Sequence, residues 1–426
     1  MAHTNSIETH GRTESIRIPE SIRDGEDGAN GRAVTGPLLV VLALLAALAP
    51  FGIDMYLPAF PIMANEFGTS ATSIQLTLTA FFVGIALGQL TFGPLSDRVG
   101  RIRPLVIGAA LLVVASVVAA MAPTVTILIV ARFVQGLAGA AGMVIGRAIV
   151  ADLAVGKNAA RAFSLMMLVS GVAPVTAPVL GSLLVEPLGW RGILWVLTGL
   201  AVLMLAAVLL VVRESNPPAR RAANRVRKIG AQSPLKALIS RDYIANTVTF
   251  IFAFAVMMAY IAASPFVYQG MIGMNAITYG ISFGINAIGV VAAGAVSARL
   301  SATAGPVKVL RAGMSVMLVA TAALIALVLT GAPAITYVGP IFFAVASVGF
   351  VLGNATALAL GAVPRAAGSA SAVLGAAQFA LAAVVSPLVV IAGEDTALPL
   401  AITMFVAAVI ALIGMLAARH GRGGHH

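Results

Sequence analysis

Twelve apolar runs of at least about 18 residues, nearly free of charged side chains, make up most of this 426-residue sequence. A helix of that length crosses the hydrocarbon core of a bilayer, which is about 30 Å thick. Inside that core each backbone N–H and C=O must find a partner within the protein, which only helices and closed barrels achieve. The runs therefore predict an all-α membrane protein with twelve transmembrane helices.

The composition agrees with a chain that lies mostly in lipid. Hydrophobic residues make up 60 % of the chain and charged residues only 10 %, whereas about 25 % of a soluble domain is charged. The connections are too short to bury a core, so we expect no receptor-like soluble domain. The predicted helices cover residues 37–57, 74–92, 104–121, 125–153, 162–185, 193–212, 243–268, 277–298, 307–329, 335–360, 366–392 and 398–417.

The placement of the basic residues predicts the orientation. If the N-terminus is cytoplasmic, nearly all of the 26 Lys and Arg residues fall in cytoplasmic segments or at their flanks, and Arg191 alone faces outward. This is the positive-inside distribution of a multi-pass protein. We therefore expect a plasma membrane location with both termini in the cytoplasm, and we assign the net charge of +11 to topology, not to nucleic-acid binding.

One polar, basic and proline-bearing segment follows the sixth run and is the only candidate domain boundary. The string GPLSDR before the third run is echoed by GAVSAR at the same turn of the second half, without the acid. Two pseudo-symmetric six-helix bundles rocking about a midplane site fit this pattern. The predicted parts are a disordered cytoplasmic arm (1–36), a first bundle (37–212), a central loop (213–242), a second bundle (243–418) and a cytoplasmic tail (419–426).

Asp54, in the stretch APFGIDMYLPAFP, is the only acidic residue deep inside an apolar run. A carboxylate at membrane depth costs at least about 2.5 kcal/mol and is a functional-site hypothesis by default. Counting from the helix ends places Arg132 within two turns of the same level, so we expect the two to pair. A movement that exchanges water for Arg132 near Asp54 would change its proton affinity. The alternatives are a static ion pair that locks the helices together, and an Asp54 that sits at the outer mouth.

Several motifs resemble those of the major facilitator superfamily. GPLSDRVGR resembles the signature between the second and third helices, and ARFVQG in the fourth run is similar to the proton-linked signature. The glycines and prolines of the fifth run resemble the motif of drug–proton antiporters, and FGIDMYLPAFP resembles the bicyclomycin- and chloramphenicol-resistance (Bcr/CflA) branch. The matching residues are Gly93, Asp97, Arg98, Gly100 and Arg101; Arg132, Gln135 and Gly136; and Gly171, Pro174, Pro178 and Gly181.

The resemblance implies roles for these motifs. Gly93 and Gly100 would permit a tight turn while Asp97 latches the inward side by pairing with basic groups or a helix N-terminus; alternatively, these charges only set topology. The helix-five prolines and glycines would seal the antiporter against leak, or only kink the helix and shape the bundle. Some relatives carry a second acid where this chain has Ala46.

Candidate substrate contacts are amides, aromatics and methionines on the predicted helices, which could equally serve packing or helix–helix hydrogen bonds. With one carboxylate and one guanidinium, the cavity suits neutral or zwitterionic amphipathic molecules. The candidates are Tyr56, Gln135, Met257, Tyr260, Asn286, Asn354 and Gln378.

These features predict a monomeric, proton-coupled exporter of small drug-like molecules, resembling the phenicols and bicyclomycin, that works by alternating access. The alternative is a proton-coupled uptake symporter or facilitator for a small metabolite. A membrane enzyme would need embedded His, Cys or paired carboxylates, yet the chain has no Cys and its five His lie in the tails. We find no Walker-type phosphate loop, and we expect the proton as coupling ion, with no metal, other cofactor or nucleic acid.

Overall fold

The computed structural model describes residues 35–154, 156–222 and 238–418. These ranges contain eleven helices that are long and apolar enough to cross a membrane. One of them, Arg161–Val211, has 51 residues, and Gly189 inside it has a φ of 65°, outside the helical range. That break divides it into the fifth and sixth predicted helices. Nearly all of the predicted arm, half of the central loop (223–237) and the tail lie outside the described residues.

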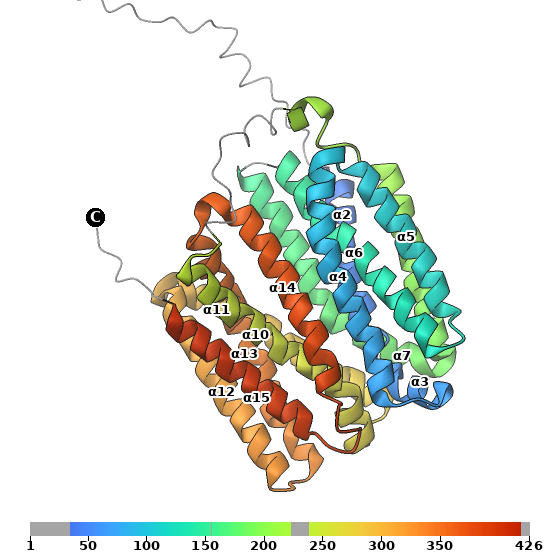
Figure 1. The fold of residues 1–426 in the computed structure, drawn as a ribbon, viewed down its shortest axis with the longest axis vertical. Coiled ribbons are helices and arrows are strands. Elements are labelled where there is room, and N and C mark those ends of the chain that lie inside the picture. The colour runs from blue at the N-terminus through green and yellow to red at the C-terminus, as the bar shows by residue number, and fades with distance from the viewer. Residues whose placement is uncertain (1–34, 155, 223–237, 419–426) are drawn as a thin grey trace, which may run out of the picture. The chain divides into compact units, whose positions relative to one another are not determined.

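The helices fall into two groups in chain order (Figure 1). The first group is α2 (Gly36–Asp54), α4 (Ala71–Val99), α5 (Ile102–Ala120), α6 (Val125–Leu153) and α7 (Gly156–Val211). The second is α10 (Arg241–Ser264), α11 (Ala276–Ala304), α12 (Pro306–Leu329), α13 (Val338–Gly361), α14 (Ala367–Leu388) and α15 (Leu398–Ala417). The short elements are η1 (Leu57–Ala59), α3 (Phe60–Phe67), η2 (Pro265–Met271), η3 (Ala334–Tyr337) and η4 (Pro364–Ala366).

Polar side chains begin several of the long helices by accepting a backbone N–H of the first turn, which has no partner inside the helix. Ser70 caps α4 and Thr124 caps α6, each at 3.3 Å. Ser240 caps α10 at 3.3 Å, and Asn275 caps α11 at 2.8 Å. These caps fix where each helix begins at the edge of the apolar run.

Two connections predicted as loops are helical instead. The proline-bearing segment after the first helix forms η1 and α3, because proline is compatible with the first turn of a helix, where its missing N–H has no partner anyway. The α4 helix continues through Gly93, Asp97 and Arg98 to Val99. The prediction ended that helix with the apolar run, but helical hydrogen bonds do not require apolar side chains.

Each group packs mainly on itself, and the largest interfaces between the groups join α4 to α14 and α7 to α11. Figure 1 shows α14 beside α4. Several hydrogen bonds cross between the groups. Gln75 Nε2 donates to Ser386 Oγ at 2.7 Å, and Thr72 Oγ1 donates to the carbonyl of Val390 at 3.2 Å. The Ala71 N–H donates to Glu394 Oε1 at 3.1 Å.

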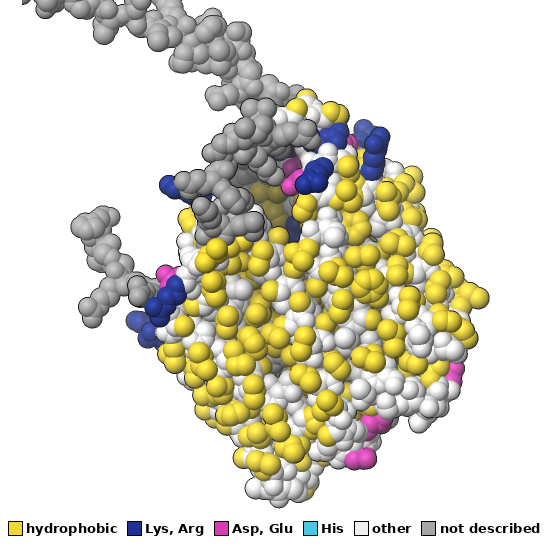
Figure 2. Space-filling view, in the orientation of Figure 1, with side chains coloured by type: hydrophobic (Ala, Val, Ile, Leu, Met, Phe, Trp, Pro, Cys, Tyr) yellow, Lys and Arg dark blue, Asp and Glu magenta, His cyan; other side chains and the backbone are white. Residues whose placement is uncertain are grey.

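We call the end that carries these inter-group bonds, with η1, α3 and η2, the closed end, and the end that carries the connection from α4 to α5 the basic end. The two ends differ in their charged side chains. Figure 2 shows hydrophobic side chains over most of the visible face, with Lys and Arg gathered along its upper and left margins. The apolar belt between the ends is the surface that a membrane-spanning protein presents to lipid.

Candidate functional site

Arg132 on α6 is fully buried, at 0 % exposure, and its guanidinium has partners on several sides. Its Nη1 atom donates to Gln135 Oε1 at 3.0 Å, and its Nη2 atom donates to the carbonyl of Gly52 on α2. The rings of Tyr56 and Phe81 lie on the guanidinium, each 4.2 Å from its central carbon. Cation–π contacts of this kind are worth about 2 kcal/mol when they are desolvated. Arg132 therefore has a fixed place inside the first group.

Two of the predicted substrate contacts turn out to support Arg132. Gln135 accepts from the guanidinium and donates its amide to Ser116 Oγ at 2.8 Å. The Tyr56 ring covers the guanidinium while its hydroxyl lies 3.1 Å from Thr77 Oγ1. The polar atoms of both side chains are thus engaged within the first group, and both side chains are buried.

Asp54, the last residue of α2, is also buried, at 3 % exposure, but it forms no ion pair with Arg132 among the described residues. The expected pairing is therefore wrong for this conformation. Each helical residue turns by about 100°, so Asp54 points about 200° away from Gly52, whose carbonyl meets Arg132. The prediction compared the depths of the two residues along their helices and left out their directions around the helix axis.

Asp54 instead lies close to the second group. The segment η1, which begins three residues after it, packs against α11 and η2, and Tyr260 of α10 and Tyr279 of α11 lie within electrostatic range of its carboxyl. Its Oδ1 atom is buried and has no hydrogen-bond partner within the described protein. The membrane-embedded carboxyl therefore lies where the two groups of helices meet, near the closed end.

The motif between α4 and α5 forms a cluster of charges at the basic end. Arg101 is buried and donates to Asp97 Oδ1, to Asp152 Oδ2 and to Ser96 Oγ, each at 2.8 Å. Burial lowers the pKa of the Arg101 guanidinium, but Asp152 and Asp97 outweigh burial, so its net pKa is raised. Arg101 is thus permanently charged and ties α4 to the end of α6. Asp97 pairs with a basic group as expected, although it does so from a helical turn.

Glu214, which the sequence analysis missed, occupies the N-terminus of α5, the kind of position that was the second of the two alternatives predicted for Asp97. Its carboxylate accepts the N–H groups of Arg101 at 2.9 Å, Ile102 at 3.2 Å and Asn216 at 2.8 Å. Burial by itself raises the pKa of Glu214, but these donors and Arg221 outweigh it, so the net pKa lies below the usual value. The polar segment directly after the sixth predicted helix was the signal that could have located Glu214.

Gly100 is the member of this motif that needs to be glycine. Its φ of 102° is disfavoured for other residues, and a Cβ there would lie 2.6 Å from Glu214 Oε2. Gly93 has no such requirement, because it lies inside α4 with ordinary contact distances. Only one of the two predicted turn glycines therefore lies in a turn.

The helix-five motif lies at the interface of α7 with two neighbours. A Cβ at Gly181 would lie 1.8 Å from the carbonyl oxygen of Met55, so α2 and α7 touch through their backbones there. On the other side, a Cβ at Gly280 of α11 would lie 3.2 Å from the carbonyl oxygen of Pro178. Gly171 is close to Val291 of α11, and Pro174 lies within α7 between these contacts. The motif thus packs α7 against both groups of helices.

The remaining substrate candidates have different surroundings. Asn354 is fully bonded within the second group, to Ser297, Ser301 and the carbonyl of Phe350. Met257 and Gln378 are half-buried. Tyr260 and Asn286 are buried, and Tyr260 Oη and Asn286 Oδ1 each lack a hydrogen-bond partner in the described protein. Tyr260 lies within electrostatic range of Asp54.

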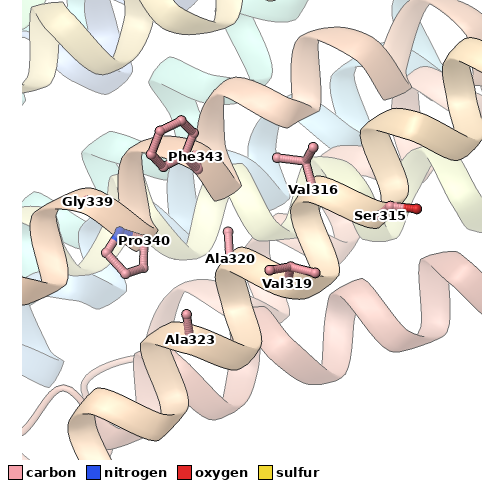
Figure 3. A pocket seen from close by; sticks show the side chains of 8 residues that line it. All are labelled: Ser315, Val316, Val319, Ala320, Ala323, Gly339, Pro340 and Phe343. Carbon is pink, nitrogen blue, oxygen red and sulfur yellow. The ribbon is translucent and has the colours of Figure 1, made fainter.

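Two cavities differ in character. A small one of about 30 Å³ lies beside Arg132 and is lined by residues of the first group, including Gln135 and Ser116. A groove of about 550 Å³ lies between α12 and α13. Figure 3 shows its walls, which include Val319, Pro340 and Phe343. Because Val319 and Phe343 are exposed and the lining is almost entirely apolar, this groove belongs to the apolar outer surface. Asp54 is not among its lining residues.

The chain belongs to the Major Facilitator Superfamily, whose sequence profile matches residues 42–387. It is 36 % identical over 390 residues to the uncharacterized MFS-type transporter YdgK of Bacillus subtilis, covering 90 % of this chain and 96 % of that protein. It is 29 % identical to the bicyclomycin resistance protein homolog of Haemophilus influenzae, covering 90 % of this chain and 96 % of that protein. It is 30 % identical to the multidrug resistance protein MdtL of Escherichia coli, covering 80 % of this chain and 85 % of that protein.

Solved structures support the same fold. A bacterial homolog of the human lysosomal transporter Spinster matches with a TM-score of 0.70 at 17 % identity, covering 90 % of this chain and 96 % of that one. A D-xylose–proton symporter matches with a TM-score of 0.66 at 16 % identity, covering 88 % of this chain and 96 % of that one. The protein is therefore a multi-pass membrane transporter and not an enzyme. The relatives also confirm the predicted resemblance to the bicyclomycin-resistance branch.

Proposed function

We propose that this transporter exports small amphipathic drugs, such as phenicols or bicyclomycin-like compounds, in exchange for protons. Alternating access of the two groups of helices would carry the exchange, with Asp54 as the proton carrier, a monomer as the working unit and both termini in the cytoplasm. The observation that carries the proposal is the buried Asp54 carboxyl at the contact between the two groups of helices, which has no ion-pair partner among the described residues.

Desolvation makes such a carboxyl suitable for carrying a proton. An ionised carboxylate buried without a partner costs several kcal/mol, so the neutral form is favoured while the site is sealed. Access to water on either side of the membrane would restore ionisation. Because Arg132 has its own partners in the first group, it contributes a fixed positive charge in this conformation instead of neutralising Asp54 directly.

The relatives support the proposed direction and substrate class. The names of two of them refer to resistance against bicyclomycin or multiple drugs, and resistance is what export produces. One proton moving down a potential of 100 mV yields about 2.3 kcal/mol. That sustains about a fifty-fold gradient of a neutral solute, enough for resistance to a compound that leaks slowly inward.

Transport by purified protein in proteoliposomes tests the proposal. With an imposed proton gradient, we expect radiolabelled chloramphenicol or bicyclomycin to move against the proton flow, and a pH-sensitive dye to report the coupled proton movement. Asp54→Asn should abolish transport driven by the gradient while still exchanging substrate across the membrane. Full gradient-driven transport by Asp54→Asn would rule out Asp54 as the carrier.

The same vesicles separate export from uptake. A proton-coupled symporter would move its substrate in the direction of the proton flow, and a facilitator would ignore the gradient. Because the fold is shared with a D-xylose–proton symporter, the fold alone does not set the direction. Movement of the drug with the protons would replace the exporter proposal with the symporter alternative.

A further inference from the structure

A second basic residue lies within the membrane-spanning helix α6, on the side of the basic end. Arg147 is partly buried, and its one hydrogen bond within the described ranges runs from Nε to the carbonyl of Met143 on the same helix, at 3.0 Å. Its two Nη groups have no partner among the described residues. An ionisable side chain inside a membrane helix is costly and is a functional-site hypothesis by default.

The Arg147 side chain runs toward the interior of the membrane. A basic side chain near the end of a transmembrane helix normally extends to the nearby membrane surface, where water and headgroups solvate its charge. The bond to Met143, four residues earlier, instead directs the side chain back along α6, away from the basic end, where α6 ends at Leu153. Ten residues separate Met143 from Leu153, so this bond lies about 15 Å inside that end of the helix.

The acids nearest to Arg147 in this group leave its charge uncompensated. Asp152, five residues later on α6, bonds to Arg101 at 2.8 Å, lies 4.0 Å from Arg220 and accepts from Ser215 Oγ at 3.0 Å. Asp54, the acid inside α2, forms no ion pair with Arg147 in the described part of the chain. Arg147 is therefore a cation inside the protein without an acidic partner from the described residues.

The neighbours of α6 show which way Arg147 points around the helix axis. Three sides of this stretch of α6 are covered by helices of the first group, one each by α4, α5 and α2. Residues four apart lie on the same side of a helix, so Met143 and Arg147 share the fourth side, between α4 and α2. The residues that define the covered sides are Ala140 and Val144 for α4, Ala141 for α5, and Gly142 and Gly146 for α2.

This fourth side of α6 faces the space between the two groups of helices. The α4 helix packs on α14, and η1, which follows α2, packs on α11, so the gap between α4 and α2 is turned toward the second group. The larger interfaces of α6 itself are with helices of the first group, namely α4, α5, α2 and α7. Figure 2 shows the molecule hollowed at the basic end. The partial exposure of Met143 and Arg147 agrees with their facing this hollow.

A planar anion matches the open positions of Arg147. With Nε engaged, the two Nη groups remain, and a carboxylate can accept two parallel bonds from a guanidinium. Arg132 is less suited to this, because its guanidinium already has carbonyl, amide and ring partners. Arg147 also adds a second guanidinium to the one carboxylate and one guanidinium considered in the sequence, which favours a negatively charged ligand.

We propose that Arg147 binds the carboxylate of an amphipathic substrate that enters the space between the two groups of helices from the basic end. The preferred substrates then carry one carboxylate beside an apolar body, as acids or as zwitterions. This inference rests on the proposed export of small amphipathic molecules and narrows their class. Neutral compounds bind without this contact, and therefore more weakly.

Binding of a matched pair of fluorescent compounds tests the inference. Dansylglycine carries a carboxylate, and dansylglycinamide has the same apolar body with a neutral amide. Both are titrated into the full chain in phosphatidylcholine nanodiscs, without a proton gradient. We expect the parent to bind the acid about ten- to hundred-fold more tightly than the amide, because a hydrogen-bonded pair of charges is worth about that factor.

Substitution of Arg147 separates its charge from its shape. Arg147→Gln should weaken binding of the acid by about ten- to hundred-fold and leave binding of the amide unchanged. Arg147→Lys keeps the charge but loses the paired N–H donors, so its affinity for the acid should lie between the two. Arg311→Gln, at an exposed position of α12, is the matched control and should bind both compounds like the parent.

Three results would overturn the inference. The first is a parent that does not prefer the acid, including one that binds neither compound. The second is unchanged binding of the acid by Arg147→Gln. The third is an equal loss of both compounds in Arg147→Gln, because Arg147 would then support the fold and not the carboxylate.

An anionic lipid headgroup is the other source of a negative group, and a second set of nanodiscs distinguishes it. We expect phosphatidylglycerol in the bilayer to leave binding of the acid unchanged. If this lipid instead displaces the acid from the parent but not from Arg311→Gln or Arg147→Gln alike, or from all of them only where Arg147 is present, the site holds a headgroup and the inference is wrong. Because no proton gradient is used, each of these failures leaves the exporter proposal standing, and that proposal fails separately if drugs do not move against protons in vesicles.

Discussion

At the scale of single residues, Arg132 and Asp54 illustrate how two buried ionisable groups at similar depth acquire different surroundings. Arg132 has carbonyl, amide and ring partners within the first group. Asp54 lies within electrostatic range of Tyr260 of the second group, and its Oδ1 atom has no hydrogen-bond partner in the part of the chain that the structure describes. A buried ionisable group with a complete set of partners stabilises one arrangement of the helices around it. A buried group without such partners can change its protonation state without breaking existing bonds.

Gly181 allows a residue-scale test of the close contact between α2 and α7. In Gly181→Ala the new Cβ would collide with the carbonyl oxygen of Met55, so we expect a loss of stability of about 1–3 kcal/mol or more and loss of transport. Gly199→Ala, in the part of α7 after the break at Gly189, is the control, because nothing lies within 4 Å of a Cβ there. Thermal unfolding in detergent measures both, and an equal response of the two variants would contradict the proposed contact.

At the scale of elements, the connections hold each group of helices together from outside the membrane core. Near the closed end, Glu66 accepts from Trp190 Nε1 at 2.6 Å and pairs with Arg191, which also donates to the carbonyl of Ala122. Arg191 is the one basic residue predicted on the external side, and its positive charge is thus paired with the Glu66 carboxylate. The side chains of the pair are about 40 % exposed, so the pair contributes at most about 1 kcal/mol to the stability of the fold. Its main effect is to hold together three connections: the end of α3, the break in α7 and the link between α5 and α6.

Glu214 gives a test at the element scale, because it caps α5 from the segment after α7. Its pKa is lowered in the folded protein, so its stabilising effect is present above the unfolded value of about 4.3 and is lost as the pH falls through the lower folded value. Glu214→Gln should reduce stability by about 1 kcal/mol at neutral pH and by less near pH 4. Unfolding temperatures of the parent and the variant at both pH values measure this difference.

The exposed Glu186 provides the control for that experiment. We expect Glu186→Gln to unfold like the parent at both pH values. If Glu214→Gln and Glu186→Gln behave alike, the cap on α5 contributes nothing measurable.

At the scale of the whole molecule, the bonds between the two groups of helices at the closed end are few and local. Gln75 and Ser386 are both fully buried and are joined by the 2.7 Å bond. A contact of this kind is suited to a transporter, because breaking a small number of such bonds lets the groups separate while each keeps its own core.

Ser386→Ala should therefore shift the balance between closed and open forms of this end. Losing the bond and leaving Gln75 without a partner costs the closed form about 1 kcal/mol, which is about a five-fold change in population. Pulsed electron spin resonance between spin labels at Asn65→Cys and Asp395→Cys, the only cysteines in such a variant, measures the change. Thr321→Ala is the matched control, since that buried hydroxyl bonds within its own helix, and an equal population shift in this control would remove the evidence for the inter-group bond.

Much of this protein could be predicted from the sequence alone. The length and apolarity of the runs determine the helices, because a membrane leaves backbone groups no other partner than the helix itself. The placement of Lys and Arg predicts the topology, and the motifs indicate the superfamily. The depth of Asp54 also follows from the sequence, since residue number measures distance along a helix.

Only the tertiary structure decided which buried groups meet. Three features depend on how helices distant in sequence rotate and pack. They are the direction of Asp54 around the axis of α2, the contacts of Arg132 with the carbonyl of Gly52 and two aromatic rings, and the cap that Glu214 places on α5. Helical periodicity is weak evidence where both faces of a helix are apolar, as they are in a membrane. The partners of polar side chains are therefore fixed by packing between helices, and that packing leaves the Asp54 carboxyl at the contact between the two groups.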